Sequence, residues 1–241
     1  MVPAFADVQA AVTVLGRIPV RPERVLDLAG AYLVGAQLTG ANLRDATLDR
    51  ANLANAKLAG AQLTGASLDE SNLKRADLDW AILVNVSLYS AHLEGADLNG
   101  ADFTDSRLVD AQLSYVDLNG ANLTGTSLIG SNFTNASGAD ARLTRANLTG
   151  AKLTGVALVR ANLSGADLDG ADMSRADLRS VNLTGATLNP ADLSPVNRRP
   201  GTPSSIVPTN LTGAHVTDVD FTGANLTGVV GLPPGFTGAT G

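Results

Sequence analysis

The strongest constraint on this chain is a five-residue repeat that runs without interruption from residue 26 to residue 195. Leu28, Leu33 and every fifth residue after them are the centres of 34 units, and the centre is Leu, Phe or Met in 33 of them. The residue two before the centre is Ala in 25 of the 34 units. Because a period of five matches neither the 3.6-residue period of an α-helix nor the alternation of a long strand, each unit must be a short extended piece followed by a corner.

The last position of each unit carries the residues that a corner needs. It is Gly in 15 of the 34 units and Asn or Asp in seven more, and these residues tolerate the positive φ that the third residue of a type II turn requires. Four corners close a coil of 20 residues, and such coils stack through parallel backbone ladders about 4.8 Å apart. Because aromatic residues make up only 4% of the chain, columns of Leu and Ala must fill the interior. The sequence therefore predicts an all-β, four-sided parallel β-helix.

One unit departs from the pattern at its centre. Gly138 stands where the other units carry a large apolar residue, and Phe133, one unit earlier in the same coil, is larger than the usual Leu. Because protein interiors tolerate few voids, we expect Phe133 to take up part of the missing volume.

Units such as residues 96–100 (Ala-Asp-Leu-Asn-Gly) and 121–125 (Ala-Asn-Leu-Thr-Gly) resemble those of the pentapeptide-repeat family. The resemblance implies a right-handed quadrilateral β-helix, a handedness that the spacing alone does not provide. It also implies a functional range: some members bind type II topoisomerases as DNA-mimicking rods and confer quinolone resistance.

The sequence outside the uninterrupted repeat predicts a cap at each end of the rod and one interruption of the repeat. Phe5, Val8, Val12 and Leu15 have helical spacing within residues 4–15, which predicts a short helix that caps the first coil. Prolines and a shift of three positions interrupt the repeat before residue 209. The predicted divisions are an N-terminal cap (1–25), the repeat rod (26–195), a Pro-rich loop (196–208), a final coil of four units (209–228) and a C-terminal cap or tail (229–241).

Composition narrows the class of function. The net charge of −6 disfavours direct binding of nucleic acid, which requires clustered Lys and Arg. The absence of cysteine excludes disulfides and thiolate metal sites. No stretch approaches the roughly 20 apolar residues of a membrane span, and the first fifteen residues lack the basic region and cleavage site of a signal peptide. We therefore expect a cytoplasmic protein without a membrane span in this chain.

No arrangement of residues typical of catalysis is evident. His92 and His215 are more than a hundred residues apart and lie in no metal or triad spacing. The glycines occur singly at corners, so no phosphate-binding loop is predicted. We expect no enzymatic activity, no cofactor and no metal.

Residues 20 apart should lie directly above one another, which sorts the outward residues by wall. Wall 1 contains the units centred on Leu28, Leu48 and each twentieth residue thereafter; walls 2, 3 and 4 start from Leu33, Leu38 and Leu43. Within the rod, wall 1 has seven acids against two arginines, a net charge of −5. These acids are the candidate acidic binding face: Asp27, Asp49, Asp69, Glu70, Asp110, Asp167 and Asp169. The alternative is that they are ordinary solvated residues at positions where the repeat accepts Asp.

The opposite wall is acidic as well. Wall 3 has six acids against three bases, and walls 2 and 4 are close to neutral. Asp77, Asp97 and Asp117 fall in one vertical column of wall 3. Because like charges so close repel, we expect local hydrogen bonds to compensate them, with a cation or a basic ligand as the alternatives.

An apolar strip is the second candidate surface. Tyr89, Val109 and Ile129 occupy one outward column of wall 1 in three successive coils, and Trp80, Ile82 and Val84 lie around the preceding corners. Contiguous apolar groups are typical of interfaces, so these six residues predict a protein-binding surface, with harmless surface variation as the alternative.

The sequence thus favours a non-catalytic rigid scaffold for an unidentified protein partner. The alternative, implied by the resemblance and by the acidity, is a DNA-mimicking regulator or protector of type II topoisomerase (DNA gyrase). The split of charge between two opposed walls, and Arg198 and Arg199 in the loop, weaken this alternative. A homodimer through the apolar strip is also compatible with the pattern.

Overall fold

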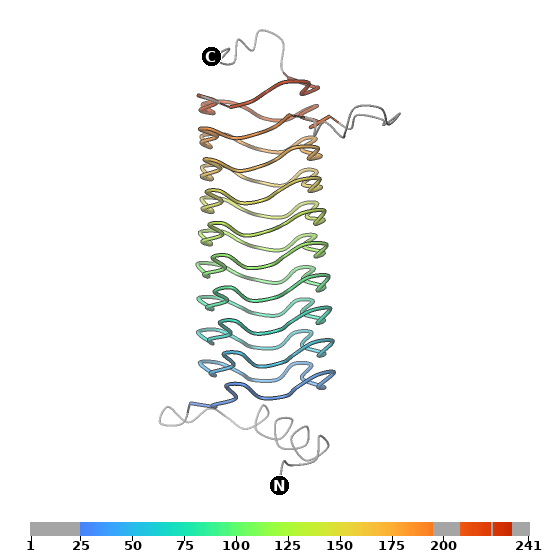
Figure 1. The fold of residues 1–241 in the computed structure, drawn as a ribbon, viewed down its shortest axis with the longest axis vertical. Helices are drawn as coiled ribbons and strands as arrows, with labels where there is room; N and C mark the ends of the chain where they lie inside the picture. The colour runs from blue at the N-terminus through green and yellow to red at the C-terminus, as the bar shows by residue number, and fades with distance from the viewer. Residues whose placement is uncertain (1–24, 195–207, 223, 233–241) are drawn as a thin grey trace, which may run out of the picture.

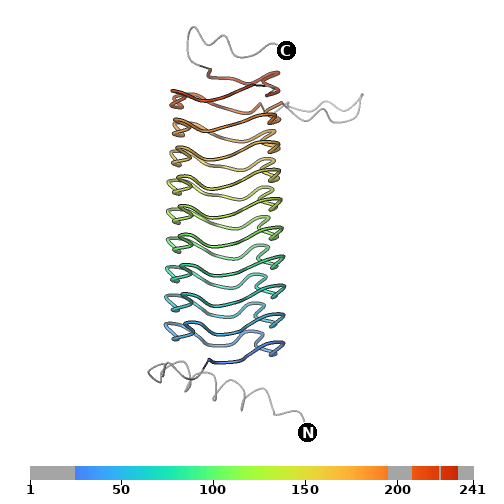
Figure 2. The same ribbon diagram turned by 90° about the vertical axis from the view of Figure 1, so that its left-hand side faces the viewer.

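The computed structural model describes residues 25–194, 208–222 and 224–232. They form a straight rod of stacked coils (Figure 1), and the view turned by 90° shows the same regular stack (Figure 2). The predicted right-handed, four-sided β-helix is confirmed, and none of the described residues is helical. The capping helix expected over residues 4–15 lies outside the described residues.

Each wall contributes one bridging residue per coil rather than a long strand. All bridges are parallel, and from Asp27 with Thr47 to Asp172 with Asp192 the partners are 20 residues apart. The Leu28 amide donates to the Thr47 carbonyl at 2.7 Å, and the Thr47 amide donates to the Leu26 carbonyl at 2.9 Å. The same two bonds recur along every wall, so the main chain satisfies its polar groups between coils.

The corners have the geometry that their residues predict. In nearly every described unit, the carbonyl of the centre accepts a bond from the amide three residues on, as the Leu28 carbonyl does from Ala31 at 3.0 Å. The intervening corner residue has positive φ, for example +64° at Gly30. Among the described residues, eighteen other than glycine adopt the same conformation, with φ between 52° and 61°. Trp80 is the bulkiest of these eighteen.

The ladder keeps its order of walls on either side of residues 195–207. Asp177 pairs with Asn210, and Asp192 pairs with Asn225. Asn210 then pairs with Val230, so wall 3 gains one further bridge beyond the unit centred on Leu226.

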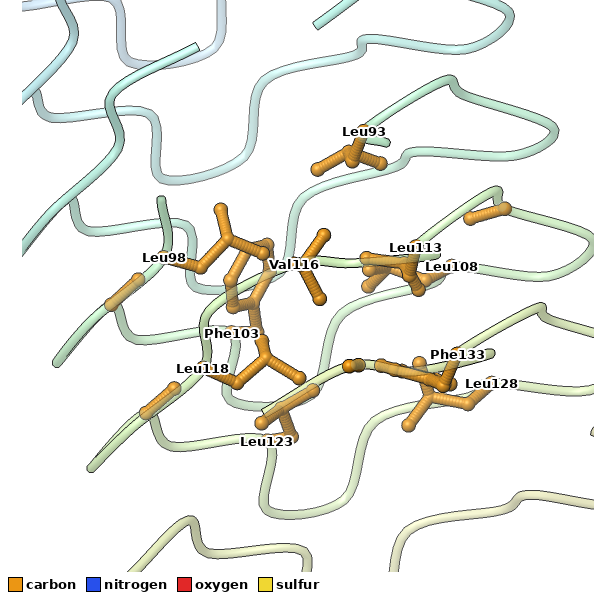
Figure 3. Packing of buried hydrophobic residues seen from close by; sticks show 14 of the residues in the cluster. Leu93, Leu98, Phe103, Leu108, Leu113, Val116, Leu118, Leu123, Leu128 and Phe133 are labelled. Carbon is orange, nitrogen blue, oxygen red and sulfur yellow. The ribbon is translucent and has the colours of Figure 1, made fainter. Parts of the chain in front are cut away.

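Leu and Ala fill the interior, as the repeat predicts. Figure 3 shows Leu98, Phe103, Leu113 and their neighbours directed into the space between the walls, and nearly all of these side chains are completely buried. A few polar residues replace Ala. The Ser106 hydroxyl, for example, donates to the Leu83 carbonyl of the coil below at 2.6 Å and accepts a bond from the Val86 amide at 3.1 Å. Hydrogen bonding to main-chain groups makes such substitutions tolerable.

The side-chain atom nearest to the Cβ position of Gly138 belongs to the coil above. A Cβ atom placed there would lie 2.8 Å from Leu158 Cδ2, 3.6 Å from Ala141 Cβ and 3.7 Å from Leu118 Cβ. The three nearest groups therefore do not include Phe133. The end of the Leu158 side chain lies nearest to this Cβ position, and the compensation by Phe133 stays a prediction.

Candidate functional site

The apolar column of wall 1, defined as Tyr89, Val109 and Ile129, is continuous in the structure. The Ser90 amide donates to the Val109 carbonyl, and the Asp110 amide donates to the Ile129 carbonyl, both at 2.9 Å. Tyr89 and Ile129 are exposed, by 46% and 39%, and Val109 is half-buried. Three apolar side chains in successive coils therefore face solvent in a single line.

The other three residues of the predicted strip occupy a different part of the rod. Ile82 and Val84 lie on wall 4 and are half-buried, and Trp80 lies at the corner between walls 3 and 4. Trp80 is 72% exposed. The register separates these residues from the column of wall 1 by the corner at Asn85. The six candidate residues thus divide into two surfaces.

Many acids of wall 1 hydrogen-bond along the rod axis. The Asp49 Oδ1 atom accepts bonds from the Ser67 hydroxyl at 2.5 Å and the Asp69 amide at 3.1 Å. Asp69 Oδ1 repeats this arrangement one coil higher, with Ser87 at 2.6 Å and the Tyr89 amide at 2.8 Å. These two carboxylates therefore tie neighbouring coils together and hold the base of the apolar column.

The remaining acids of wall 1 have varied roles. Asp27 and Asp167 accept bonds from amides two residues on, and Asp169 accepts one from the Asn189 amide at 2.8 Å. Glu70 pairs with Arg50 at 2.8 Å, and the Arg50 guanidinium lowers the pKa of Glu70. The Asp110 carboxylate has no hydrogen-bond donor among the described residues and packs over Gly130. Wall 1 keeps its net negative charge although several of its carboxylates support the fold.

The acidic column of wall 3 is only partly compensated. Asp77 lies 3.5 Å from the Lys57 ammonium, and Asp117 accepts a bond from the Asn119 amide at 3.2 Å. Asp97, between them, accepts no hydrogen bond from any described residue. Burial raises the pKa of Asp97, and the charges of Asp79, Asp77 and Asp117 raise this pKa further. The expectation of local hydrogen bonds thus holds for the ends of this column and not for its centre.

The histidines remain apart in the structure. His92, on wall 2, lies 3.4 Å from Glu94, which also pairs with Lys74 at 3.1 Å. His215 bridges Asn182 on wall 4. In the described part of the chain, no group of three or more histidine, aspartate or glutamate side chains could hold a metal ion. Nor do residues 25–194, 208–222 and 224–232 include a helix with the length and apolarity to cross a membrane.

Two features of the corners escaped the sequence reasoning. Tyr115 replaces the corner glycine of a unit in wall 2 and is 67% exposed. The indole ring of Trp80 covers Gly100, which occupies the same corner one coil higher. A Cβ atom on Gly100 would be only 2.8 Å from Trp80 Cδ2. The 20-residue spacing between an aromatic corner residue and a corner glycine is the signal that identifies this packing.

Comparisons with known proteins agree with this architecture. A family model described as pentapeptide repeats matches in eight copies, over residues 26–53, 46–85, 81–120, 117–155, 158–194 and 209–230. The solved structure of full-length QnrB1, a plasmid-mediated fluoroquinolone resistance protein, is 19% identical. It has a TM-score of 0.52, over 82% of this chain and 93% of that one. HetL, a pentapeptide repeat protein involved in heterocyst differentiation regulation from the cyanobacterium Nostoc sp., is 29% identical. Its TM-score is 0.47, over 79% of this chain and 87% of that one. No protein of curated function matches the sequence.

Proposed function

Because this chain belongs to the pentapeptide-repeat family, we propose that it is a non-catalytic, rigid scaffold that binds a protein partner along wall 1. Members of the family are generally non-enzymatic structural or interaction proteins. The observation that carries the proposal is the apolar column of Tyr89, Val109 and Ile129, which presents apolar side chains to solvent in three successive coils of one wall. Contiguous exposed apolar groups are typical of binding surfaces.

Charge around the column indicates the chemistry of the partner. Asp69 lies directly below Tyr89, and Asp110 occupies the corner beside Val109. Across the rod, wall 1 has a net charge of −5. A partner with an apolar ridge and basic residues on both sides would complement this surface. A second copy of the chain, docked through the same wall, would place −5 against −5, so a different protein fits better than a homodimer.

The test is a double variant, Val109→Thr with Ile129→Thr, which keeps β-branched residues in the column. Matched controls are Val34→Thr with Val159→Thr, the same kind of change at half-buried outward positions of walls 2 and 3. A partner captured by the wild-type protein should bind the column variant about 5- to 30-fold more weakly, because roughly 1 to 2 kcal/mol of apolar burial is lost. It should bind the control variant with unchanged affinity.

Melting temperatures establish that both variants fold, and sedimentation reports self-association. If both variants bind the partner as tightly as the wild type does, wall 1 is not the interface. If instead the wild type is a dimer that the column variant dissociates, the homodimer replaces the scaffold proposal.

A second candidate function is regulation or protection of a type II topoisomerase such as DNA gyrase. The acidic charge of wall 1 favours it, since a negatively charged rod can occupy a basic surface that normally holds DNA. The apolar column argues against it, because between Glu70 and Asp167 wall 1 carries a single acid, Asp110. Arg198 and Arg199 lie outside the described residues.

A gyrase supercoiling assay with the purified protein tests this second candidate. A DNA mimic should change supercoiling, and Asp110→Asn should weaken the effect without harming the fold, because the Asp110 carboxylate accepts no hydrogen bond from the described residues. No change in supercoiling or in quinolone sensitivity at any protein concentration would exclude it and leave the scaffold proposal intact.

A further inference from the structure

Trp80 stands at a position that disfavours it. It occupies the last position of its unit, where Gly is the commonest residue, and adopts φ +59°. A left-handed conformation is uncommon for residues other than Gly, Asn and Asp, and it is an outlier for a bulky side chain. Unfavourable backbone conformations of this kind persist where the surrounding structure enforces them, as it does at the other corners of this rod.

The Trp80 ring packs against a glycine of the next coil. The indole covers Gly100, and any side chain there would collide with it: the Cδ2 atom lies 2.8 Å from the Cβ position of Gly100. One coil higher, Gly120 has nothing within 4 Å of its own Cβ position. The Trp80 ring therefore packs on a corner that carries no side chain, Gly100, and remains 72% exposed. The same corner one coil higher, at Gly120, also carries no side chain.

Acidic residues adjoin Trp80 in the chain and in the neighbouring ladders of walls 3 and 4. Asp79 precedes Trp80 in the chain, Asp77 and Asp97 are bridged on wall 3, and Asp102 bridges Ile82 on wall 4. In the described part of the chain, the one cation paired with these carboxylates is Lys57, 3.5 Å from Asp77. Asp97 accepts no hydrogen bond from the described residues, and burial, followed by the charges of Asp79, Asp77 and Asp117, raises its pKa. A cation bound at this corner would interact with the face of the indole ring and with several carboxylates.

We propose that the corner around Trp80 is a docking surface for an arginine side chain of a partner protein. A guanidinium can stack on an indole face and hydrogen-bond to carboxylates at its edge at the same time, whereas the compact ammonium of lysine stacks poorly. The acids exclude nucleic acid as the occupant. Because this corner adjoins wall 3, opposite the apolar column of wall 1, the two surfaces are independent, and failure of one proposal leaves the other standing.

The full-length protein supplies its own probe, because Trp80 is its single tryptophan. The ligand is a capped hexapeptide of alternating arginine and glycine, compared with its lysine and glutamate counterparts and with calcium chloride. The arginine peptide should change the Trp80 fluorescence in a saturable manner that weakens with salt. The lysine peptide should bind several-fold more weakly, and the glutamate peptide should not bind. Equal responses to the arginine and lysine peptides, or a response to calcium alone, would overturn the assignment to arginine.

Variants locate the binding on the rod, with a dye-labelled arginine peptide and anisotropy as the readout. Trp80→Gly restores the commonest corner residue, so it should fold well but bind the peptide about 3- to 30-fold more weakly, which corresponds to about 0.6 to 2 kcal/mol. Asp97→Asn should also weaken binding. The matched control is Tyr115→Gly, since Tyr115 is an exposed aromatic corner residue with φ +60° on wall 2, beside the basic Lys74 and Arg75.

The control variant should bind as the wild type does. If Trp80→Gly leaves the affinity unchanged, or if Tyr115→Gly lowers it equally, the peptide binds by general charge attraction, and the proposal is wrong.

Discussion

Replacing Gly138 by alanine should stabilise the rod, although most glycines here resist substitution. Gly138 is a centre position and lies outside the left-handed region, so alanine meets no backbone strain there. The side chains around it also pack less completely than elsewhere: Leu118 and Phe133 keep 2% exposure, and Leu143 and Leu158 keep 3%, in the middle of a rod whose other central Leu residues are mostly at 0–1%. The packing around Gly138 is therefore slightly looser than in most of the rod.

The magnitude follows from three contributions. Replacing Gly by Ala reduces the conformational entropy of the unfolded chain, which is worth about 0.4 to 1 kcal/mol. Burying one methyl group adds about 0.8 kcal/mol. The new Cβ would lie 2.8 Å from Leu158 Cδ2, the mobile end of a side chain, and turning it away costs roughly 0.5 kcal/mol. The net gain is about 1 kcal/mol, or roughly 2 to 4 °C in melting temperature for a chain of this length.

The assay is thermal unfolding followed by circular dichroism, with Gly120→Ala as the matched control. Gly120 has φ +68° and open space around its Cβ position, so alanine there is strained and buries nothing. It should lower stability by roughly 1 kcal/mol. The same substitution is thus expected to have opposite signs at two positions of wall 3 in neighbouring coils. A lower melting temperature for Gly138→Ala, or equal changes at both sites, would refute this account of the packing.

Three further predictions concern single side chains. Gly100→Ala should destabilise the rod more than Gly120→Ala does, and it should also shift the fluorescence emission of Trp80, because the added methyl group displaces the indole. Unchanged emission would show that the ring does not pack on Gly100. Because burial and neighbouring carboxylates raise the pKa of Asp97 above 3.8, its ionisation costs stability as pH rises through that raised pKa. Asp97→Asn should therefore melt higher than wild type at pH 7 but not at pH 3. The opposite sign holds for Asp177, whose pKa is lowered mainly by its hydrogen bond from Arg179. Arg179→Gln should lower the melting temperature at pH 7, and the difference should vanish as acid protonates Asp177.

Some of the candidate site could be assigned from the register alone. Because the coil contains 20 residues, Tyr89, Val109 and Ile129 had to stack, and so did Asp77, Asp97 and Asp117. The register also places Trp80 and Ile82 one wall away from that apolar column. Counting positions could not show how exposed each side chain is, which is why Ile82 and Val84 entered the candidate interface although both are half-buried.

The sequence by itself determined the path of the main chain. A period of five, a large apolar centre in nearly every unit and a residue at the end of most units that tolerates positive φ require a four-sided coil, although not its handedness, because a unit must both bury its centre and turn a corner. The tertiary structure decided the contacts between coils. Three contacts between coils join residues 20 apart. They are the packing of Leu158 against Gly138, the packing of the Trp80 ring on Gly100, and the hydrogen bond that Asp69 accepts from the Tyr89 amide. They depend on side-chain rotamers, which no one-dimensional period specifies.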